Sequence, residues 1–335
     1  MARRTILITG AAGVIGTALL PHLREEPVIC MTRATGLAPT GFPVDVVSGD
    51  VARPDLGLDP AAYRDLAARV DLVVHSAALT DWAAPAEDLR RANVDGTRHV
   101  VEFCRQAGAQ IVHIGTAFTQ ALRHDAPLAI PPENTIVNYV GAKREANAIV
   151  RESGLEATLV HPTNLVGETT TGWAAATQIM QLTSEYILRG KVPYLQTRKE
   201  ALVDVVPQDT VGAALAAICL HEPIGGEYWL TAGADSMSLD EMVSILVEFA
   251  AEIGRPIKRP EAVDPADVAT VAASLPPAKR ALFILMAHLA DGMVACEMFP
   301  TSLPELRERY DLPYLPPAAA FRKSLAYSRS QSPVG

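Results

Sequence analysis

Tyr139 and Lys143 are the residues in this sequence whose types and spacing most directly suggest chemistry. Positions i and i+4 share one face of a helix, so a helix here would point the phenol and the ammonium the same way. A tyrosine alone has a pKa of about 10 and is a poor acid–base catalyst at neutral pH. A nearby ammonium favours the phenolate, so we expect Lys143 to lower the pKa of Tyr139. The same spacing also occurs on ordinary helices, so the pair needs support from its surroundings.

Thr116 supplies part of that support. It follows residues 110–114, an apolar run that reads as a buried strand. A hydroxyl at the end of that strand could donate a hydrogen bond to the same substrate oxygen that the phenol would protonate. The sequence therefore predicts Thr116, Tyr139 and Lys143 as a catalytic set, with Tyr139 beginning a helix that continues to about residue 152.

A glycine-rich turn near the start of the chain indicates a nucleotide-binding site, beside which this catalytic set would act. Residues 5–8 have the β-branched bias of a buried strand, and residues 17–23 read as a helix. In a strand–turn–helix unit the first glycine allows a tight turn, the second lets the backbone approach a pyrophosphate, and the third lets helix pack on strand. The helix N-terminus then offers N–H groups to the phosphates. Unless this is an ordinary glycine turn, the dinucleotide contacts are Gly10, Ala12, Gly13, Val14, Ile15 and Gly16.

Arg33 indicates which dinucleotide binds. It ends the second predicted strand, residues 28–32, and no Asp or Glu stands there. An acidic residue would hold the ribose 2′-hydroxyl of NAD, whereas an arginine can accept the 2′-phosphate of NADP. The sequence therefore predicts NADP(H), with a solvated surface arginine as the alternative interpretation.

Two further strand ends complete the predicted cofactor site. Asp50 and Val51 follow a third strand, where the Asp50 carboxylate could accept a hydrogen bond from the adenine amino group or cap the next turn. Ala77 and Ala78 follow a fourth strand, and such small residues let a cofactor lie close to the backbone.

Composition limits the class of protein and its partners. The 335 residues are 49% hydrophobic and carry a net charge of −9, which argues against a nucleic-acid partner. The longest apolar stretch, residues 281–290, is too short to span a bilayer. We expect no cleavable signal before the first strand, and hence a cytoplasmic location. No metal site is predicted, because all four cysteines stand singly and read as free thiols: Cys30, Cys104, Cys219 and Cys296.

The ordered set of motifs resembles the extended short-chain dehydrogenase/reductases over residues 5 to about 232. Besides the glycine turn and Tyr139-x-x-x-Lys143, it includes His75-Ser-Ala-Ala78 and Asn93-Val-x-Gly-Thr97. The resemblance implies Tyr139 as proton donor, Lys143 as ribose ligand and pKa tuner, and Thr116 as the oxygen-polarising hydroxyl. It also implies that these three residues and Pro162, in the family-like segment 160–167, contact the cofactor.

Within that superfamily the chain is most similar to thioester reductases and fatty acyl reductases, which use NADPH to reduce a carrier-bound or CoA-bound acyl group. The similarity lies in residues 50–58, 75–78 and 167–172. The chain departs from the family pattern near the substrate side, where Ser, Arg and Val are usual at three positions occupied here by Gly115, His161 and Gln208.

The implied fold class is α/β, a Rossmann-type doubly wound parallel sheet with a smaller carboxyl-terminal α/β substrate domain. We expect an NADP-binding domain over 1–165 with returning segments near 201–222, a substrate-binding domain over 166–200 and 223–325, and a flexible tail over 326–335. Other expected features are helices over 173–188 and 238–253, a proline-broken loop over 260–277, and an apolar channel for an acyl chain lined from 268–273 and 282–289.

These expectations favour an NADPH-dependent reductase that transfers hydride to a carbonyl or thioester of an acyl or polyketide-like substrate, carrier-bound or free. The alternative is a ketoreductase, epimerase or dehydratase acting on a free small molecule or a sugar nucleotide. A non-catalytic NADP sensor is a third class, against which the intact catalytic set argues. The expected assembly is a monomer or homodimer.

Overall fold

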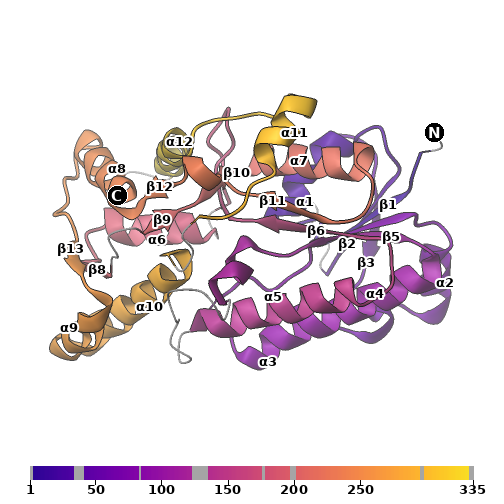
Figure 1. Ribbon diagram of the computed structural model, residues 1–335, viewed down its shortest axis with the longest axis horizontal. Coiled ribbons are helices and arrows are strands. Elements are labelled where there is room, and N and C mark those ends of the chain that lie inside the picture. The colour runs from indigo at the N-terminus through magenta and orange to yellow at the C-terminus, as the bar shows by residue number, and fades with distance from the viewer. Residues whose placement is uncertain are drawn as a thin grey trace.

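The computed structural model describes residues 3–33, 41–82, 84–122, 135–175, 178–196, 201–294 and 298–331. Two lobes lie side by side (Figure 1). One is built on a parallel sheet with helices on both faces, and the other is built mainly from helices. No helix of the described residues is both long and apolar enough to cross a membrane.

Within the described residues, seven parallel strands form the central sheet in the order β11-β6-β5-β4-β1-β2-β3. The strand order reverses between β1 and β4, the switch point at which doubly wound sheets bind ligands. Strands β1, β2 and β4 are buried along their whole length, as expected for a sheet covered on both faces. The strands are β1 (Ile6–Thr9), β2 (Val28–Thr32), β3 (Asp45–Ser48), β4 (Leu72–His75), β5 (Gln110–Ile114), β6 (Ala157–Pro162) and β11 (Glu227–Leu230).

Helices cover the two faces of this sheet (Figure 1). One face carries α1 (Val14–Leu19), η1 (Leu20–Leu23), α7 (Gln208–His221) and α11 (Leu303–Tyr310). The other carries α2 (Pro60–Ala67), α3 (Ala86–Leu89), α4 (Gly96–Ala107) and α5 (Thr135–Arg151), with η2 (Pro54–Gly57) and η4 (Ala117–Leu122) nearby. The fold class predicted from the sequence is confirmed.

Residues 86–107 form one continuous helical run that is not uniform. Its middle, η3 (Arg90–Asp95), is a π-helical segment between α3 and α4. Gly96 follows it, and a Cβ there would lie 3.2 Å from Val51 Cγ2. The absence of a side chain at Gly96 therefore allows α4 to pack closely on Val51.

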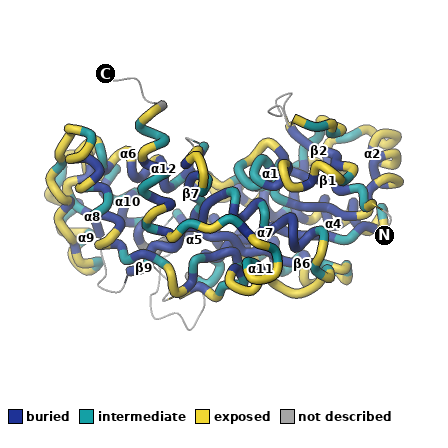
Figure 2. The backbone as a smooth tube through the Cα atoms, turned by 90° about the horizontal axis from the view of Figure 1, so that it is seen from above, coloured by how far each residue is buried: buried dark blue, intermediate teal, exposed yellow. Residues whose placement is uncertain are grey.

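The described residues of the second lobe form helices and three short strand pairs. Its helices are α6 (Ile179–Leu188), α8 (Leu239–Glu252), α9 (Val268–Ser274), α10 (Pro277–Val294) and α12 (Pro317–Gln331), with the short turns η5 (Gly233–Asp235) and η6 (Pro265–Asp267). The pairs are β7 (Asn164–Val166) with β10 (Val205–Pro207), β8 (Tyr194–Gln196) with β13 (Glu261–Val263), and β9 (Leu202–Val203) with β12 (Met237–Ser238). Figure 2 shows buried backbone running through both lobes.

Three expectations for the second lobe are wrong. The helix expected from residue 173 begins only at 179, because the preceding turn is fixed by Glu168 N donating to Trp173 O (3.0 Å). The loop expected over 260–277 contains β13, η6 and α9 instead. Its prolines flank these elements rather than interrupt them, and Pro265 occupies a helix-start position that tolerates proline.

The third error concerns the chain end. The tail expected to fray from 326 is helical to Gln331 within α12, and Ser324 on that helix is fully buried. Gly167 N donates to Ser324 Oγ (3.0 Å), which ties the helix to a segment 157 residues earlier. Strand β11 also lies in the Rossmann sheet, although residues 223–325 were assigned to the second domain.

The described cysteines Cys30, Cys104 and Cys219 are buried free thiols. Cys296 lies outside the described residues.

Candidate active site

A cavity of about 760 Å³ lies at the carboxyl ends of β1, β2 and β4. This is the edge of the sheet at which the strand order reverses. Eight of the residues predicted to contact a dinucleotide line it: Gly10, Ala12, Gly13, Arg33, Asp50, Val51, Ala77 and Ala78.

The glycine turn lines this cavity and packs closely on neighbouring backbone. Gly10 has φ +75°, and a Cβ there would lie 2.6 Å from Ala77 N. A Cβ on Gly16 would lie 2.6 Å from the backbone of Ala11. Gly13 N donates to Gly10 O at 2.9 Å, closing the turn. The turn can therefore be built only with glycine at the first and last of these positions.

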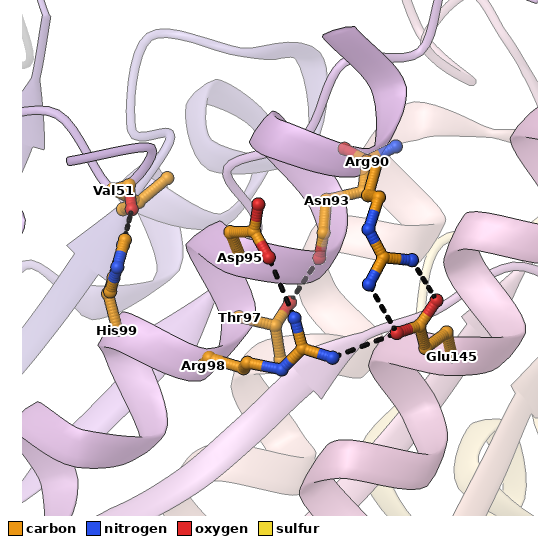
Figure 3. A network of polar contacts seen from close by, with 8 residues as sticks. All are labelled: Val51, Arg90, Asn93, Asp95, Thr97, Arg98, His99 and Glu145. Atoms are coloured by element: carbon orange, nitrogen blue, oxygen red, sulfur yellow. Dashed lines mark hydrogen bonds and ion pairs between the residues drawn. The ribbon is translucent and has the colours of Figure 1, made fainter. Parts of the chain in front are cut away.

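The predicted Asn93 motif holds another part of the lining, the backbone at Leu79 that follows β4. Leu79 N donates to Asn93 Oδ1 (2.7 Å), and Asn93 Nδ2 donates to Leu79 O (3.0 Å). Thr97 Oγ1 donates to Asn93 O (2.6 Å), as Figure 3 shows. The π-helical segment thus clamps the backbone that follows β4. Sequence reasoning recognised this motif without finding what it holds.

The same helices are tied to α5, which carries Tyr139 and Lys143. Arg90 and Arg98 both donate to the Glu145 carboxylate, with closest contacts of 2.8 Å each (Figure 3). Such exposed pairs contribute little individually, but a shared carboxylate fixes the relative positions of η3, α4 and α5.

Three arginines line the cavity, of which the sequence indicated only Arg33. Arg53 follows the Asp50 turn, and Arg91 lies in the π-helical segment, paired with Asp88 at 2.8 Å. No local pattern marks a helical residue as facing a cavity, so Arg91 could not be found from the sequence. Asp50 Oδ1 accepts from Ala52 N (3.0 Å), so its turn-capping interpretation is correct.

The remaining predicted contacts do not line this cavity. Val14, Ile15 and Gly16 form the first turn of α1 beside it. Pro162 ends β6 and is paired in register with Leu230 of β11.

Thr116, Tyr139 and Lys143 are brought together in the interior. Tyr139 lies in the second turn of α5, not at its start, and a side-chain hydrogen bond joins it to Thr116. Lys143 Nζ donates to the carbonyl of Ile114 (2.8 Å), at the end of β5. All three side chains are buried.

The protonation of this set differs from expectation. Burial raises the pKa of Tyr139 to about 12, against the opposing effect of its hydrogen bond to Thr116. Burial lowers the pKa of Lys143 to about 8. The predicted lowering of the Tyr139 pKa by Lys143 is therefore wrong for this arrangement, because the ammonium is bound to the Ile114 carbonyl. A pKa this high keeps the phenol protonated at neutral pH.

An aromatic wall covers the phenol. Trp82 stacks on Tyr139 with ring centroids 5.8 Å apart, and Phe118 meets Trp82 edge-on at 5.4 Å. Phe299, from the second lobe, meets Phe118 edge-on at 5.6 Å. Both lobes thus contribute to the apolar surroundings that keep Tyr139 protonated, and the sequence did not single out Trp82 or Phe299.

Two departures from the family pattern occur together in the structure. A Cβ on Gly115 would lie 2.8 Å from His161 Nδ1 and 2.9 Å from Asn147 Oδ1. The histidine ring therefore occupies the space that a side chain at 115 would need. His161 also stacks on Trp229 (4.3 Å) and contacts Glu227 Oε2 through Nε2 (3.1 Å).

The predicted apolar channel is not found where it was expected. Phe283 is buried in a small core with Val263 and Ala272, and Met286 is buried in the main core of the second lobe. These side chains fill packing positions because α9 and β13 cover the helix that was expected to border an open loop.

Comparison with protein families matches residues 43–215, about half of the chain, to the family described as Male sterility protein. Among curated proteins, trichosetin synthetase PKS-NRPS1 of Gibberella fujikuroi is 28% identical over 236 residues, which are 67% of this chain and 6% of that protein. The L-2-aminoadipate reductase large subunit of Penicillium chrysogenum is 26% identical over 270 residues, which are 66% of this chain and 19% of that protein. This chain thus spans a small part of each relative.

Among solved structures, the terminal R domain from the myxalamid PKS-NRPS biosynthetic pathway has a TM-score of 0.76 at 22% identity. The match covers 99% of this chain and 92% of that one. The likeness shows a shared fold that includes the second lobe.

Proposed function

We propose that this chain, which belongs to the Male sterility protein family within the extended short-chain dehydrogenase/reductases, is an NADPH-dependent reductase. One observation carries the proposal. A buried, protonated tyrosine is hydrogen-bonded to a threonine hydroxyl and lies one helical turn from a buried lysine. General acid catalysis needs such a positioned donor.

The 760 Å³ cavity fits a dinucleotide. Gly10 brings backbone to its surface, and its lining has three arginines, Arg33, Arg53 and Arg91, against two carboxylates, Asp50 and Asp88. A guanidinium forms strong paired hydrogen bonds with phosphate, so three of them suit a cofactor with an additional 2′-phosphate. On this basis NADP(H) is the proposed cofactor, and Arg33 is the proposed contact to the 2′-phosphate.

Bound in this cavity, the cofactor would supply the hydride that reduces a carbonyl carbon. Thr116 would donate a hydrogen bond to the carbonyl oxygen, and Tyr139 would donate the proton to that oxygen as negative charge develops. Lys143, mostly protonated at neutral pH, would bind the ribose hydroxyls and so hold the nicotinamide ring beside Tyr139. The aromatic wall of Trp82 and Phe118 would limit the access of water to the phenol.

The proposed substrate is an acyl or polyketide-like thioester or carbonyl compound, presented on a carrier. The support is the similarity to part of a PKS-NRPS synthetase and to an aminoadipate reductase subunit. An apolar channel along α10 no longer supports it. We assign cofactor binding to residues 1–165 and 201–222 together with β11. Most of the remaining residues are proposed to form the substrate site.

The test is a substrate panel with the purified full chain and NADPH. We expect oxidation of NADPH with an acyl thioester, slower or no oxidation with simple ketones, and none with sugar nucleotides. Retention of NADP(H) through desalting, together with conversion of a sugar nucleotide, would instead support an epimerase or dehydratase.

A further inference from the structure

A buried polar pair lies between helix α5 and the central sheet. It consists of Asn147 on α5, which is 2% exposed, and His161 on β6, which is 1% exposed. By geometry, Asn147 Oδ1 and His161 Nδ1 have no hydrogen-bond partner among the described residues. Polar atoms buried to this degree cost stability unless a bound molecule satisfies them, so both atoms point to a ligand.

The two atoms face the same space beside Gly115. The position that a Cβ on Gly115 would take lies 2.8 Å from His161 Nδ1 and 2.9 Å from Asn147 Oδ1. Both atoms are thus within about 3 Å of one point, which is the usual length of a hydrogen bond. Turning that point about the line between the two atoms, away from the glycine Cα, keeps both lengths. One small molecule can therefore bond both atoms.

The protonation of His161 decides which kind of molecule fits. Burial lowers the pKa of His161 although Glu227 raises it, so the ring is neutral at neutral pH and carries one N–H. Burial raises the pKa of Glu227, but the hydrogen bonds and charges of Arg151 and His161 keep that pKa below its usual value. The ionised carboxylate only accepts, and its Oε2 lies 3.1 Å from His161 Nε2. The N–H is therefore on Nε2, and Nδ1 is an acceptor.

The molecule between the pair must be a double donor. Asn147 Oδ1 is an acceptor like His161 Nδ1, and two acceptors cannot bond each other. Water has two O–H donors and is the usual partner of such buried groups. The Lys143 ammonium is near enough to lower the pKa of His161, but it donates to the Ile114 carbonyl (2.8 Å).

The space beside Gly115 adjoins the residues proposed for catalysis. Gly115 stands between Ile114 and Thr116 at the end of β5. The Ile114 carbonyl accepts from Lys143 Nζ (2.8 Å), and Gly115 N donates to Val160 O (2.8 Å). Groups that fix the chain at Gly115 therefore also fix the positions of the ammonium and of the threonine hydroxyl.

We propose that His161 is a positioning residue that shares an ordered water with Asn147 beside Gly115, and that this unit fixes the end of β5. The inference rests on the proposed function, which gives Thr116 and Lys143 their catalytic roles. It accounts for two departures from the family pattern together, because a serine at 115 would meet the histidine ring at 161.

Crystallography at atomic resolution and NMR of the histidine ring nitrogens test the water and the tautomer in the full chain. We expect a water bonded to both His161 Nδ1 and Asn147 Oδ1, and a proton on Nε2. Absence of that water, a direct contact between the two side chains, or a proton on Nδ1 would each overturn the proposal. These measurements need no turnover, so they stand even if the chain is not a reductase.

Two variants test positioning. His161→Ala removes the ring, whereas His161→Asn keeps a polar atom near the place of Nδ1. With an acyl thioester and NADPH, His161→Ala should lower kcat at least about tenfold with little change in KM for the thioester, because small displacements of catalytic groups are costly. His161→Asn should recover part of that loss. The matched control is His221→Ala, which removes an exposed histidine stacked on Tyr310 and should leave kcat unchanged.

Unchanged kcat in His161→Ala, or equal losses in His161→Ala and His161→Asn, would overturn the proposal. The crystal structure of His161→Ala tests positioning without turnover. The contact between Lys143 Nζ and the Ile114 carbonyl should lengthen, and unchanged positions of Thr116 and Lys143 would overturn the proposal even if the parent chain is inactive.

A double-mutant cycle on stability tests the packing beside Gly115. The backbone of Gly115 is not left-handed, so a side chain there meets only the crowding around it. Gly115→Ser should lower the midpoint of urea denaturation in the parent chain, where its Cβ would lie 2.8 Å from His161 Nδ1. The same change should cost much less in the His161→Ala background. Additive losses would overturn the proposal, because the ring and the glycine would then act independently.

Discussion

Each of the two lobes is stabilised internally by a different kind of contact. In the Rossmann lobe, bare glycine backbone packs on neighbouring strand ends, as where Gly10 meets the backbone of Ala77. In the second lobe, buried polar groups join segments that are far apart in the chain. Asp204 accepts from Ala232 N (2.9 Å) and Gly233 N (3.0 Å), and Ser324 accepts from Gly167 N (3.0 Å).

This difference affects how each lobe depends on its sequence. The glycine contacts form a cradle from one short turn, in which a side chain at Gly10 would meet the backbone of Ala77. The second lobe depends instead on polar contacts between segments far apart in the chain. Tyr139 lies where the lobes meet, under an aromatic wall built from both.

The largest expected effect is on chemistry. Tyr139→Phe should lower turnover by about two to four orders of magnitude, the range for general acid–base groups, while the fold and cofactor affinity persist. Lys143→Ala should reduce both cofactor binding and turnover, because Lys143 is proposed to act in both. Steady-state kinetics with cofactor titration measures these effects, and near-normal turnover in Tyr139→Phe would show that another group donates the proton.

The next largest expected effect is on the free energy of unfolding, when a glycine of each lobe is replaced with alanine. Gly10 (φ +75°) and Gly254 (φ +73°) share a backbone conformation, but a Cβ on Gly254 has nothing within 4 Å. Gly254→Ala should cost about 1–2 kcal/mol in the free energy of unfolding, from conformation alone. Gly10→Ala should cost at least about twice as much, because its Cβ meets backbone that cannot move aside cheaply. Urea denaturation of both variants measures this, and equal losses would show that the cradle is not rigid.

Acid should affect the sheet lobe through its buried histidines. Burial lowers the pKa of His75 to about 3 and the pKa of His113 far below its usual value, with nearby Lys143 adding to both effects. The unfolded chain therefore binds more protons below pH 6.5, and the free energy of unfolding should fall as pH decreases from about 6.5.

His113→Leu tests the source of this acid sensitivity. Neither ring nitrogen of His113 has a hydrogen-bond partner by geometry among the described residues, although Asn147 raises its pKa slightly against the effect of burial. The leucine variant should be tolerated at pH 7 and should show a shallower loss of stability in acid. An unchanged pH profile would place the sensitivity elsewhere.

A smaller effect concerns cofactor choice. Arg33→Ala should weaken NADPH binding by about 1.5–3 kcal/mol while NADH binding stays the same, because only NADPH offers a 2′-phosphate. Arg91→Ala is the companion variant, since Arg91 lines the same cavity but is paired with Asp88. Fluorescence titration of both cofactors measures the affinities. An unchanged preference in Arg33→Ala, with a loss in Arg91→Ala, would move the phosphate contact to the π-helical segment.

The contrast between local contacts in the Rossmann lobe and long-range contacts in the second lobe also explains which features the sequence could predict. The glycine turn, the strand ends and the Tyr139–Lys143 spacing are local signals, and strands such as Val28–Thr32 and Gln110–Ile114 were placed correctly. Strand β13 and the end of α12 depend on partners near residues 194 and 167, so no local pattern marks them. Trp82, Phe299 and Arg91 acquire their roles only from tertiary packing, which also moved Phe283 from an expected channel wall into a core.

The smallest expected effect compares two helix caps. Ser238 Oγ accepts from Glu241 N (3.0 Å) at the start of α8, and Asp59 Oδ1 accepts from Ala61 N and Ala62 N at the start of α2. Replacing either residue with alanine should cost about 1 kcal/mol in the free energy of unfolding, the usual value for such caps. Ser238 differs because it also belongs to β12 and is paired with Leu202 of β9.

Hydrogen exchange separates the two cases where global stability does not. In Asp59→Ala, faster exchange should be confined to α2, because that cap is local and exposed. In Ser238→Ala, faster exchange should appear both in α8 and in the amides of Leu202 and Val203, because loss of the cap loosens the strand pair. Confinement of the change to α8 would mean that the remote contacts of the second lobe tolerate local fraying. The lobe would then be less dependent on long-range pairing than its Asp204 and Ser324 contacts indicate.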